Sequence, residues 1–345
     1  MARVSVVIPV YNIERHLRQC LDSVAGQSLR DIEVICVDDG STDDSPKILA
    51  DYASKDSRFQ VITQFNAGPG AARNTGMAKA TGEYLIFLDS DDWFEPDFLE
   101  RMVAKAESTE ADVTICRAAE FDSETGRELP SEWMLKSEYL PGATFSPEDI
   151  AEHIFQFTYG WPWDKLYRAG FVKRAGFCYP ALPNSEDLVF VFQGLALAEK
   201  IAVVETVLVH HRVNRASSVS NSRHRDPEAA YKAVRLLEGA LRERRFYETF
   251  ERSFLNWAME FLIWNVANLE GREARKQSFK RLRKEWLPAL PFSEHPAKYY
   301  DRFSYAKLLL ARFAPCPVFY GVNRAYHNWK DKRGEKRNGE TVSGL

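Results

Sequence analysis

The stretch YLIFLDSDDWF, residues 84–94, joins an apolar run to three carboxylates, Asp89, Asp91 and Asp92. Such a run is typical of a buried β-strand, and the carboxylates follow where that strand is expected to end. Negative charges this close together repel one another and destabilise the folded chain unless a positive group compensates them. The sequence therefore predicts a cation, from the protein or from solution, at the end of this strand.

Strand-like and helix-like segments alternate through the first 116 residues. Strands are predicted at 4–10, 32–39, 59–63, 83–89 and 112–116, and helices at 14–28, 41–55, 69–80 and 96–108. This alternation indicates an α/β fold with a mostly parallel sheet and flanking helices. Ligands of such sheets bind beyond the carboxyl ends of the strands. The segments there are polar, acidic or glycine-rich: 11–12, 38–40, 66–68 and 89–92.

The composition, with 345 residues, 45% hydrophobic and 28% charged, is that of an ordinary soluble globular protein. Met1 leads almost directly into the first predicted strand, so we expect no signal peptide. No apolar run approaches the ~20 residues that span a membrane. The five cysteines are scattered without a C-x-x-C pair, which favours a reducing compartment over a disulfide or zinc framework. We therefore expect a cytoplasmic protein.

By pattern the chain divides into four parts. Residues 1–116 carry the regular alternation, and residues 117–222 are less regular. Residues 223–335 are predicted to form a helical, basic extension, and 336–345 a disordered tail. From residue 223 onward the chain holds 25 Lys and Arg against 15 Asp and Glu, whereas the first 222 residues hold 21 against 34. This asymmetry indicates different partners for the two halves.

Asp89 and Asp91 are candidate ligands of a divalent cation. Mg²⁺ and Mn²⁺ prefer one or two protein carboxylates and complete their coordination with phosphate oxygens and water. The alternative is a helix N-terminus, where Asp residues act as caps and favour the helix dipole. One cap needs only one carboxylate, so the metal hypothesis is favoured for Asp89 and Asp91. Both interpretations stay open for Asp92.

Two further segments lie at the same expected edge of the sheet. In VDDGSTDDS (37–45), Asp39 is a candidate to bind a nucleobase or ribose, and Ser41 is predicted to cap the next helix. NAGPGAARNTG (66–76) is a glycine-containing turn into a helix that carries Arg73. It lacks the G-x-G-x-x-G spacing, so a Rossmann dinucleotide site is poorly supported. A phosphoacceptor receiver domain shares the acidic pocket but would be about a third of this length.

The motifs at 4–28, 32–45 and 66–97 together resemble the nucleotide-sugar-binding half of the family 2 glycosyltransferases, which have the Rossmann-like GT-A fold. The resemblance covers residues 3–116 almost without a gap. It implies that Asp89-Ser90-Asp91 is the D-x-D motif and that Asp91, with Asp89, binds Mn²⁺ or Mg²⁺. It also implies a nucleotide-sugar site lined by Pro9, Val10, Tyr11, Asn12, Glu14, Asp39, Gly68, Arg73, Asp89 and Ser90.

The resemblance continues more loosely through WDKLYR (163–168) and SEDLVF (185–190), which look like motifs of bacterial members that build surface polysaccharides. There a Glu-Asp pair opens a helix beside the acceptor, which implies that Asp187, with Glu186 as the alternative, is the catalytic base. An inverting transfer uses such a base to take the proton of the attacking hydroxyl. The other interpretation is that Ser185 and the two acids only cap the helix.

Two aromatic pairs in the same region have more than one interpretation. Trp161 and Trp163 either stack on a sugar ring or belong to the core. His210 and His211 stand where these relatives usually carry aromatic residues. They are predicted to be strand residues with hydrogen-bonded nitrogens rather than metal ligands.

The basic rear of the chain suggests a second kind of partner. In SYAKLLLARF (304–313), apolar and basic residues at helical spacing fit either a helix on an anionic membrane surface or a helix packed on the protein. Nucleic acid is not expected as a partner, because the acidic front half would repel it.

The predicted function is inverting, metal-dependent transfer of a sugar from a nucleoside-diphosphate sugar, with UDP as the expected nucleotide. The expected acceptor is a hydroxyl of a glycan or lipid-linked glycan in cell-surface polysaccharide synthesis, and the expected location is cytoplasmic or peripheral at the inner face of the membrane. A sugar-nucleotide nucleotidyltransferase is one alternative, but IPVYNIERH (8–16) lacks the glycine-rich loop expected there. A non-catalytic nucleotide-sugar-binding subunit is the other.

Overall fold

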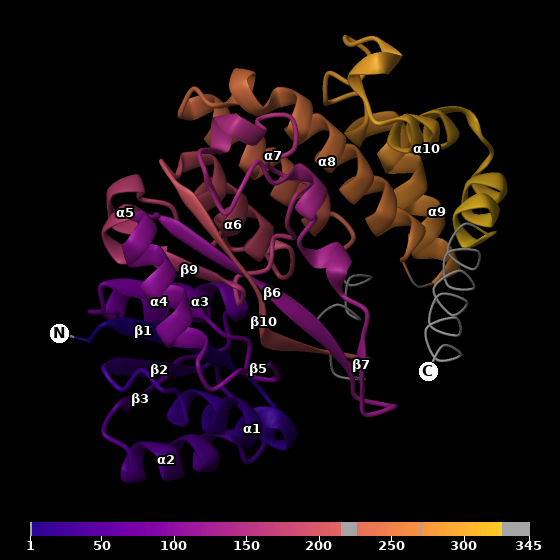
Figure 1. The fold of residues 1–345 in the computed structure, drawn as a ribbon. Coiled ribbons are helices and arrows are strands. Elements are labelled where there is room, and N and C mark those ends of the chain that lie inside the picture. The colour runs from indigo at the N-terminus through magenta and orange to yellow at the C-terminus, as the bar shows by residue number, and fades with distance from the viewer. Residues whose placement is uncertain (1, 215–225, 270, 326–345) are drawn as a thin grey trace, which may run out of the picture. The chain divides into compact units, whose positions relative to one another are not determined.

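A computed structural model describes residues 2–214, 226–269 and 271–325 (Figure 1). The chain divides into two compact units, one of residues 1–221 and 232–254 and the other of residues 222–231 and 255–345. Residues 232–254, which the sequence pattern groups with the C-terminal extension, are thus part of the first unit. The tail predicted at 336–345 lies outside the described residues.

Four parallel strands begin the central sheet of the first unit. They are β1 (Val4–Val10), β2 (Ile32–Asp38), β3 (Phe59–Thr63) and β4 (Tyr84–Phe87). β1 lies between β2 and β4, and β3 pairs with the far side of β2. Because all three pairings are parallel, the carboxyl ends of the four strands lie at one edge of the sheet, as predicted.

Strands from later in the chain extend the same sheet. The order is β3-β2-β1-β4-β9-β6-β10-β5, with β6 (Val113–Asp122), β9 (Lys165–Arg168), β10 (Ile201–Val213) and β5 (Trp93–Phe94). β9 runs antiparallel to both β4 and β6, and so separates them. The short strands β7 (Arg127–Leu129) and β8 (Thr144–Phe145) pair with β6 and β10. The predicted mostly parallel sheet is confirmed.

Helices cover both faces of the sheet (Figure 1). On one face α1 (Glu14–Ala25), α2 (Ser45–Lys55) and α4 (Phe98–Thr109) share a core with alternate residues of β1, including Val6 and Ile8. On the other face α3 (Pro69–Lys79) brings Gly76 against Val7. Successive side chains of a strand point to opposite faces, so covering both faces requires the uninterrupted apolar run of β1.

Of the remaining helices, α5 (Ala169–Ala175) and α6 (Glu186–Leu197) lie between β9 and β10 in sequence. The others follow β10 and are α7 (Ala229–Glu243), α8 (Tyr247–Ala267), α9 (Arg272–Arg281) and α10 (Arg302–Phe313), and residues 316–325 are also helical. Among the residues that the structure describes, no helix is both long and apolar enough to cross a membrane.

The structure corrects the helix cap predicted at Ser41 and decides against the capping alternative that was open for Asp92. α2 begins at Ser45 with Asp44 at its N-cap, so Ser41 does not cap it. The Ser41 hydroxyl instead accepts a hydrogen bond from the Asn12 amide, because the loop folds back onto the end of β1. Asp92 likewise does not cap α4, which begins at Phe98.

Candidate active site

The residues after β1 meet the loop after β2 at the carboxyl edge of the sheet. Pro9 and Val10 are buried within β1, whereas Tyr11, the next residue, is 50% exposed. Asn12 Oδ1 accepts a hydrogen bond from the Thr42 amide (2.8 Å), and Glu14 Oε2 accepts one from the Asp44 amide (2.8 Å). Asn12 and Glu14 therefore fix the 42–44 loop beside Tyr11.

Asp39 joins the second and third loops of this edge. Its Oδ1 accepts hydrogen bonds from Gln64 Nε2 (2.7 Å) and the Ala67 amide (2.9 Å). Its Oδ2 accepts a hydrogen bond from the Gly68 amide (2.8 Å). Gly68, with φ +91°, is the N-cap of α3, so Asp39 also determines where that helix begins. The predicted residues after β1, β2 and β3 thus lie together.

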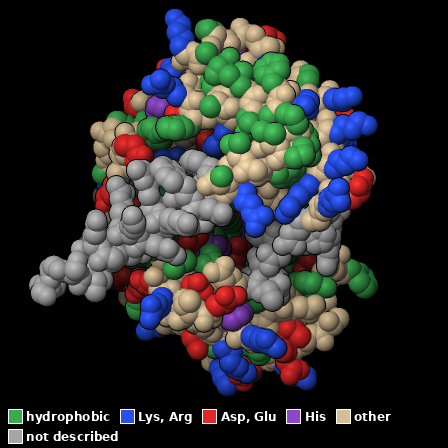
Figure 2. Space-filling model, turned by 90° about the vertical axis from the view of Figure 1, so that its right-hand side faces the viewer, with side chains coloured by type: hydrophobic (Ala, Val, Ile, Leu, Met, Phe, Trp, Pro, Cys, Tyr) green, Lys and Arg blue, Asp and Glu red, His purple; other side chains and the backbone are tan. Residues whose placement is uncertain are grey.

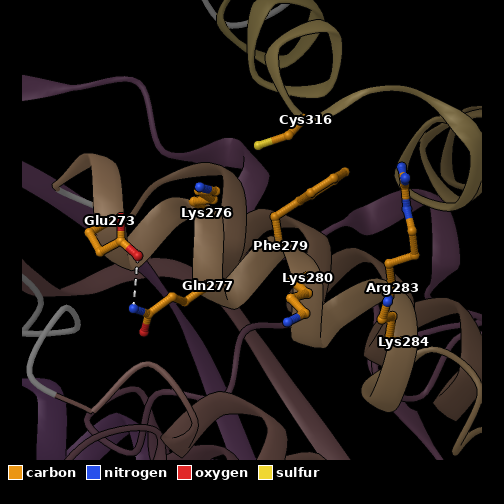
Figure 3. Close-up of a pocket in the computed structure, with 8 residues that line it drawn as sticks. All are labelled: Glu273, Lys276, Gln277, Phe279, Lys280, Arg283, Lys284 and Cys316. Carbon is orange, nitrogen blue, oxygen red and sulfur yellow. Dashed lines mark hydrogen bonds between the residues drawn. The ribbon is translucent and has the colours of Figure 1, made fainter.

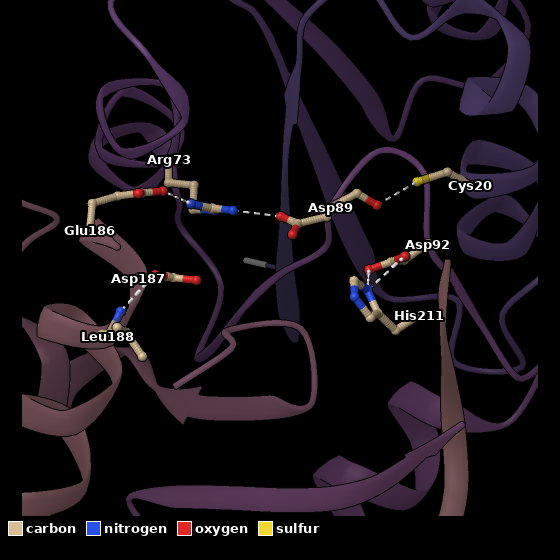
Figure 4. Close-up of polar contacts among 8 residues, drawn as sticks. All are labelled: Cys20, Arg73, Asp89, Asp92, Glu186, Asp187, Leu188 and His211. Atoms are coloured by element: carbon tan, nitrogen blue, oxygen red, sulfur yellow. Dashed lines mark hydrogen bonds and ion pairs between the residues drawn. The ribbon is translucent and has the colours of Figure 1, made fainter. Parts of the chain in front are cut away.

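Arg73 supplies one of the positive charges that the acidic loop requires. It is buried on α3, and its guanidinium donates to Asp89 Oδ1 (2.6 Å) and to Glu186 Oε1 (2.7 Å), as Figure 4 shows. Although burial lowers the pKa of Arg73, the charges around it, led by Asp89, raise that pKa above its ordinary value. Arg73 is therefore a permanent cation that joins the acidic loop to the first turn of α6.

His211 provides the second positive charge. The backbone amide of Arg212 donates to Asp92 Oδ1 (2.7 Å), and His211 Nδ1 lies 3.0 Å from Asp92 Oδ2 (Figure 4). Burial lowers the pKa of His211, but the buried carboxylate of Asp92 outweighs this and raises it to about 9. The prediction that His210 and His211 are hydrogen-bonded strand residues is confirmed, since His210 Nε2 lies 2.6 Å from Glu95 Oε1.

Arg73 pairs with Asp89 and His211 with Asp92. The main-chain carbonyl of Asp91, the third carboxylate residue of the loop, accepts a hydrogen bond from the buried Arg212 (3.0 Å). Asp91 is 8% exposed, and Asp89 Oδ2 makes no hydrogen bond to any described residue. Within the described ranges no three His, Cys, Asp or Glu side chains are arranged to hold a metal ion. Asp89 and Asp91 are of the residue type that Mg²⁺ or Mn²⁺ takes as protein ligands, with phosphate and water supplying the others.

The carboxylates of Asp187 and Glu186 differ in their exposure to solvent and in their partners. Glu186 is buried and paired with Arg73, whereas the partly exposed Asp187 accepts a hydrogen bond from the Leu188 amide (2.9 Å). Desolvation, together with the neighbouring charge of Glu186, raises the pKa of Asp187 to about 7. Ser185 makes no side-chain capping bond to α6, so the capping interpretation is not supported for Ser185. Asp187 does bond an amide of the first turn, and that part of the interpretation stays open.

The two tryptophans of the WPWDKLYR segment have different environments. Trp163 is fully buried, whereas Trp161 is only partly buried. Both rings pack against His211, with centroids 5.0 Å and 5.5 Å from the imidazole. Sequence patterns did not identify Trp133, whose ring lies 5.7 Å from Trp161 although 28 positions separate them in the chain.

The fold is shared with solved glycosyltransferase structures. The crystal structure of Staphylococcus aureus TarS 1–349 superposes with a TM-score of 0.71 at 23% identity, covering 95% of this chain and 92% of that one. This likeness assigns the chain to the GT-A fold class. Residues 5–165 match the family model described as glycosyl transferase family 2. Residues 5–165 therefore form a glycosyltransferase family 2 domain, which confirms the predicted family.

Curated relatives agree with this assignment. EpsH of Bacillus subtilis (strain 168), named as a glycosyltransferase, is 39% identical over 221 residues, or 63% of this chain and 62% of EpsH. The glycosyltransferase GlyA of Streptococcus pneumoniae is 32% identical over 218 residues, or 62% of this chain and 31% of GlyA. TarS, a poly(ribitol-phosphate) beta-N-acetylglucosaminyltransferase, is 26% identical over 299 residues, or 84% of this chain and 50% of TarS. The match thus spans less than two thirds of the length of each of these relatives.

Proposed function

We propose that this protein transfers a sugar from a UDP-sugar to a hydroxyl of a glycan or lipid-linked glycan, with inversion at the anomeric carbon. The observation that carries the proposal is the Arg73 bridge, which connects Asp89 at the expected diphosphate position to the helix that begins with Glu186 and Asp187. Related proteins support the nucleotide, since crystal structures of TarS 1–349 contain UDP and UDP-GlcNAc. We assign the reaction to cell-surface polysaccharide synthesis, because the related TarS is named as a poly(ribitol-phosphate) beta-N-acetylglucosaminyltransferase.

The residues of this site have distinct roles in the proposed reaction. Tyr11 and Asp39 bind the nucleoside, and Arg73 holds Asp89 in place. Asp89 and Asp91 would hold Mn²⁺ or Mg²⁺, which would neutralise charge on the departing diphosphate. Asp187 takes the proton of the acceptor hydroxyl as its oxygen bonds to the anomeric carbon, and the bond from that carbon to the diphosphate oxygen breaks.

Calorimetric titration of the purified chain with UDP, GDP and dTDP tests the donor assignment. We expect UDP to bind in the presence of Mn²⁺, and to bind much more weakly after EDTA treatment, because the carboxylates then repel the diphosphate. Binding of GDP or dTDP in preference to UDP would contradict the assignment of uridine. Equal UDP affinity with and without EDTA would contradict the metal site.

Two alternative functions are less well supported. A nucleotidyltransferase needs a glycine-rich loop after the first strand, and the chain has Tyr11-Asn12 there. A non-catalytic subunit would not need a carboxyl with a pKa near 7 beside the donor site, where Asp187 lies. General bases function best with pKa values near the working pH.

The pH dependence of transfer follows from Asp187. Its pKa of about 7 means that the carboxyl is protonated, and unable to accept a proton, in weakly acidic solution. We therefore expect kcat to rise between about pH 6 and pH 8 as the base ionises, and then to level off. A pH–rate profile at saturating donor and acceptor measures this. A flat profile, or one that falls over that range, would contradict the role of Asp187.

We also propose that the second unit contacts an anionic lipid surface. Phe303 and Phe313 of α10 are 74% and 75% exposed, and Val318 and Val322 of the next helix are 47% and 48% exposed. Figure 2 shows hydrophobic side chains gathered on the upper part of one face with Lys and Arg beside them. Exposed apolar side chains next to basic ones are typical of proteins that lie on anionic lipid.

A basic pocket adjoins this apolar surface. It has a volume of about 640 Å³ and is lined by α9 and the π-helix Leu282–Trp286 that follows it, including Lys276, Lys280 and Lys284, with Cys316 on its other side (Figure 3). None of these lysines forms an ion pair with a described residue. Like charges four residues apart destabilise a helix, so an anionic headgroup would relieve a repulsion already present.

Flotation with vesicles of neutral or anionic phospholipid tests the membrane proposal. We expect binding only to anionic vesicles, and release at high salt, because salt screens the lysines. Lys276→Glu/Lys280→Glu should abolish flotation, whereas Lys79→Glu/Lys173→Glu, with the same change in net charge, should not. Equal behaviour of the two variants, or no flotation of the original chain at low salt, would contradict the proposal.

A further inference from the structure

Three large aromatic side chains form a partly exposed cluster in the first unit. Trp133 and Tyr159 are 37% and 41% exposed, and their rings lie 4.8 Å apart. Trp161 stacks on Tyr159 at 4.9 Å and meets Trp133 edge-on at 5.7 Å. Aromatic rings left together at a surface usually mark a place where a ligand covers them.

Backbone contacts hold the cluster in place. A β-bridge between Leu135 and Thr158, and a hydrogen bond from the Lys136 amide to the Phe157 carbonyl (2.8 Å), bring the two segments together. The fully buried Lys165 ammonium donates to the carbonyls of Tyr159 (2.8 Å) and Trp161 (3.0 Å). The rings are therefore presented by fixed backbone.

One side of the cluster touches the helix that carries the proposed base. Gly160, between Tyr159 and Trp161, is so close to α6 that a Cβ atom there would lie 2.2 Å from Leu188 Cδ2 and 3.1 Å from Leu188 Cα. Only glycine permits this approach. Because Leu188 follows Asp187, the aromatic cluster lies directly beside the first turn of α6.

The other side of the cluster touches His211 of β10, which is bonded to the acidic loop. Trp161 packs against His211, whose ring is bonded to Asp92. A molecule lying on the cluster would therefore be next to both the proposed base and the proposed metal-binding loop. That is where an acceptor has to be held for its hydroxyl to meet the donor sugar.

We propose that Trp133, Tyr159 and Trp161 bind a pyranose ring of the acceptor, an inference that rests on the transferase function proposed above. One face of a pyranose ring consists largely of C–H groups, which pack on aromatic rings while the hydroxyls at the rim stay available for hydrogen bonds. An open-chain polyol phosphate offers no such face. The acceptor is thus a glycan that ends in a sugar ring, and not a chain of the poly(ribitol-phosphate) kind named for TarS.

Saturation-transfer NMR on the whole chain, loaded with UDP and the diamagnetic ion Mg²⁺, tests this site. The probes are methyl β-glycosides of glucose, galactose and N-acetylglucosamine, with ribitol 5-phosphate as the open-chain comparison. We expect saturable binding of at least one glycoside, about tenfold weaker in Trp133→Ala and Tyr159→Ala, and largely retained in Trp133→Phe. Tyr139→Ala removes a ring that stacks on His153 instead and should leave binding unchanged.

Measuring UDP affinity in each protein separates the two proposals. Unchanged UDP affinity shows that a variant is folded and that its donor site is intact. If UDP does not bind to the original chain, the proposed transferase function fails. If UDP binds but no glycoside does, if Trp133→Ala and Tyr159→Ala bind glycosides as well as the original chain, or if ribitol 5-phosphate is preferred, the acceptor site is overturned.

Discussion

Replacing Asp187 with Asn is expected to lower kcat for transfer by roughly 10²–10⁴ while leaving UDP affinity unchanged. Asn has nearly the same shape, and its side-chain oxygen can still accept the hydrogen bond of the Leu188 amide that Asp187 accepts. It cannot take a proton from the acceptor hydroxyl. Turnover with saturating substrates and calorimetric titration with UDP measure the two quantities separately.

Glu186→Gln is the informative comparison for Asp187→Asn. Glu186 is buried and forms an ion pair with Arg73, so neutralising it leaves a buried cation partly unpaired. Removing one partner of a buried pair typically costs about 3–5 kcal/mol of stability. We therefore expect the unfolding temperature to fall in Glu186→Gln but not in Asp187→Asn, because the raised pKa of Asp187 means that removing its charge relieves a cost to the folded state near neutral pH. Loss of UDP binding in Asp187→Asn would make this residue part of the donor site, and unchanged kcat would remove it as the base.

Asp91→Asn is expected to reduce metal-dependent turnover at least about 10²-fold, because it removes a charged ligand from a two-carboxylate site. Asp89 cannot replace it fully, since one of its oxygens is already bonded to Arg73 (2.6 Å). Titrating Mn²⁺ into the activity assay, together with electron paramagnetic resonance of bound Mn²⁺ in the presence of UDP, measures the loss.

Asp97→Asn is the matched control for the Asp91 variant. Asp97 is another carboxylate close in sequence, its side chain is 50% exposed, and it makes no side-chain capping bond to α4. The Asp97→Asn variant should bind Mn²⁺ with the same affinity, and transfer sugar at the same rate, as the original chain. Full Mn²⁺-dependent activity in Asp91→Asn would contradict the metal assignment.

The edge of the sheet could be predicted because each of its parts is encoded locally. The apolar runs of β1, β2 and β4 are continuous in sequence, and a polar segment follows each strand directly. The three carboxylates of YLIFLDSDDWF also led to the prediction that a positive charge lies at the end of its strand. The sources of that charge were not predicted: Arg73, 16 positions from Asp89, was assigned only to the nucleotide site, and His211 meets Asp92 across 119 positions of the chain.

The features that escaped prediction depend on contacts between distant segments. β9 enters the sheet between β4 and β6 although residues 123–164 separate it from β6 in sequence, and no local pattern indicates this. Ser41 and Asp92 have the residue types of helix caps, but tertiary hydrogen bonds to Asn12 and Arg212 engage them instead. No sequence pattern pointed to Trp133, because it joins the aromatic cluster only through contacts with Tyr159 and Trp161, which are distant in the chain.

Nucleotide release from a panel of UDP-, GDP- and dTDP-sugars, each assayed with Mn²⁺ and with EDTA, tests the central claim most directly. The account predicts release of UDP from at least one UDP-sugar with Mn²⁺, and its loss with EDTA. Release that is unaffected by EDTA, or no release from any UDP-sugar, would contradict it.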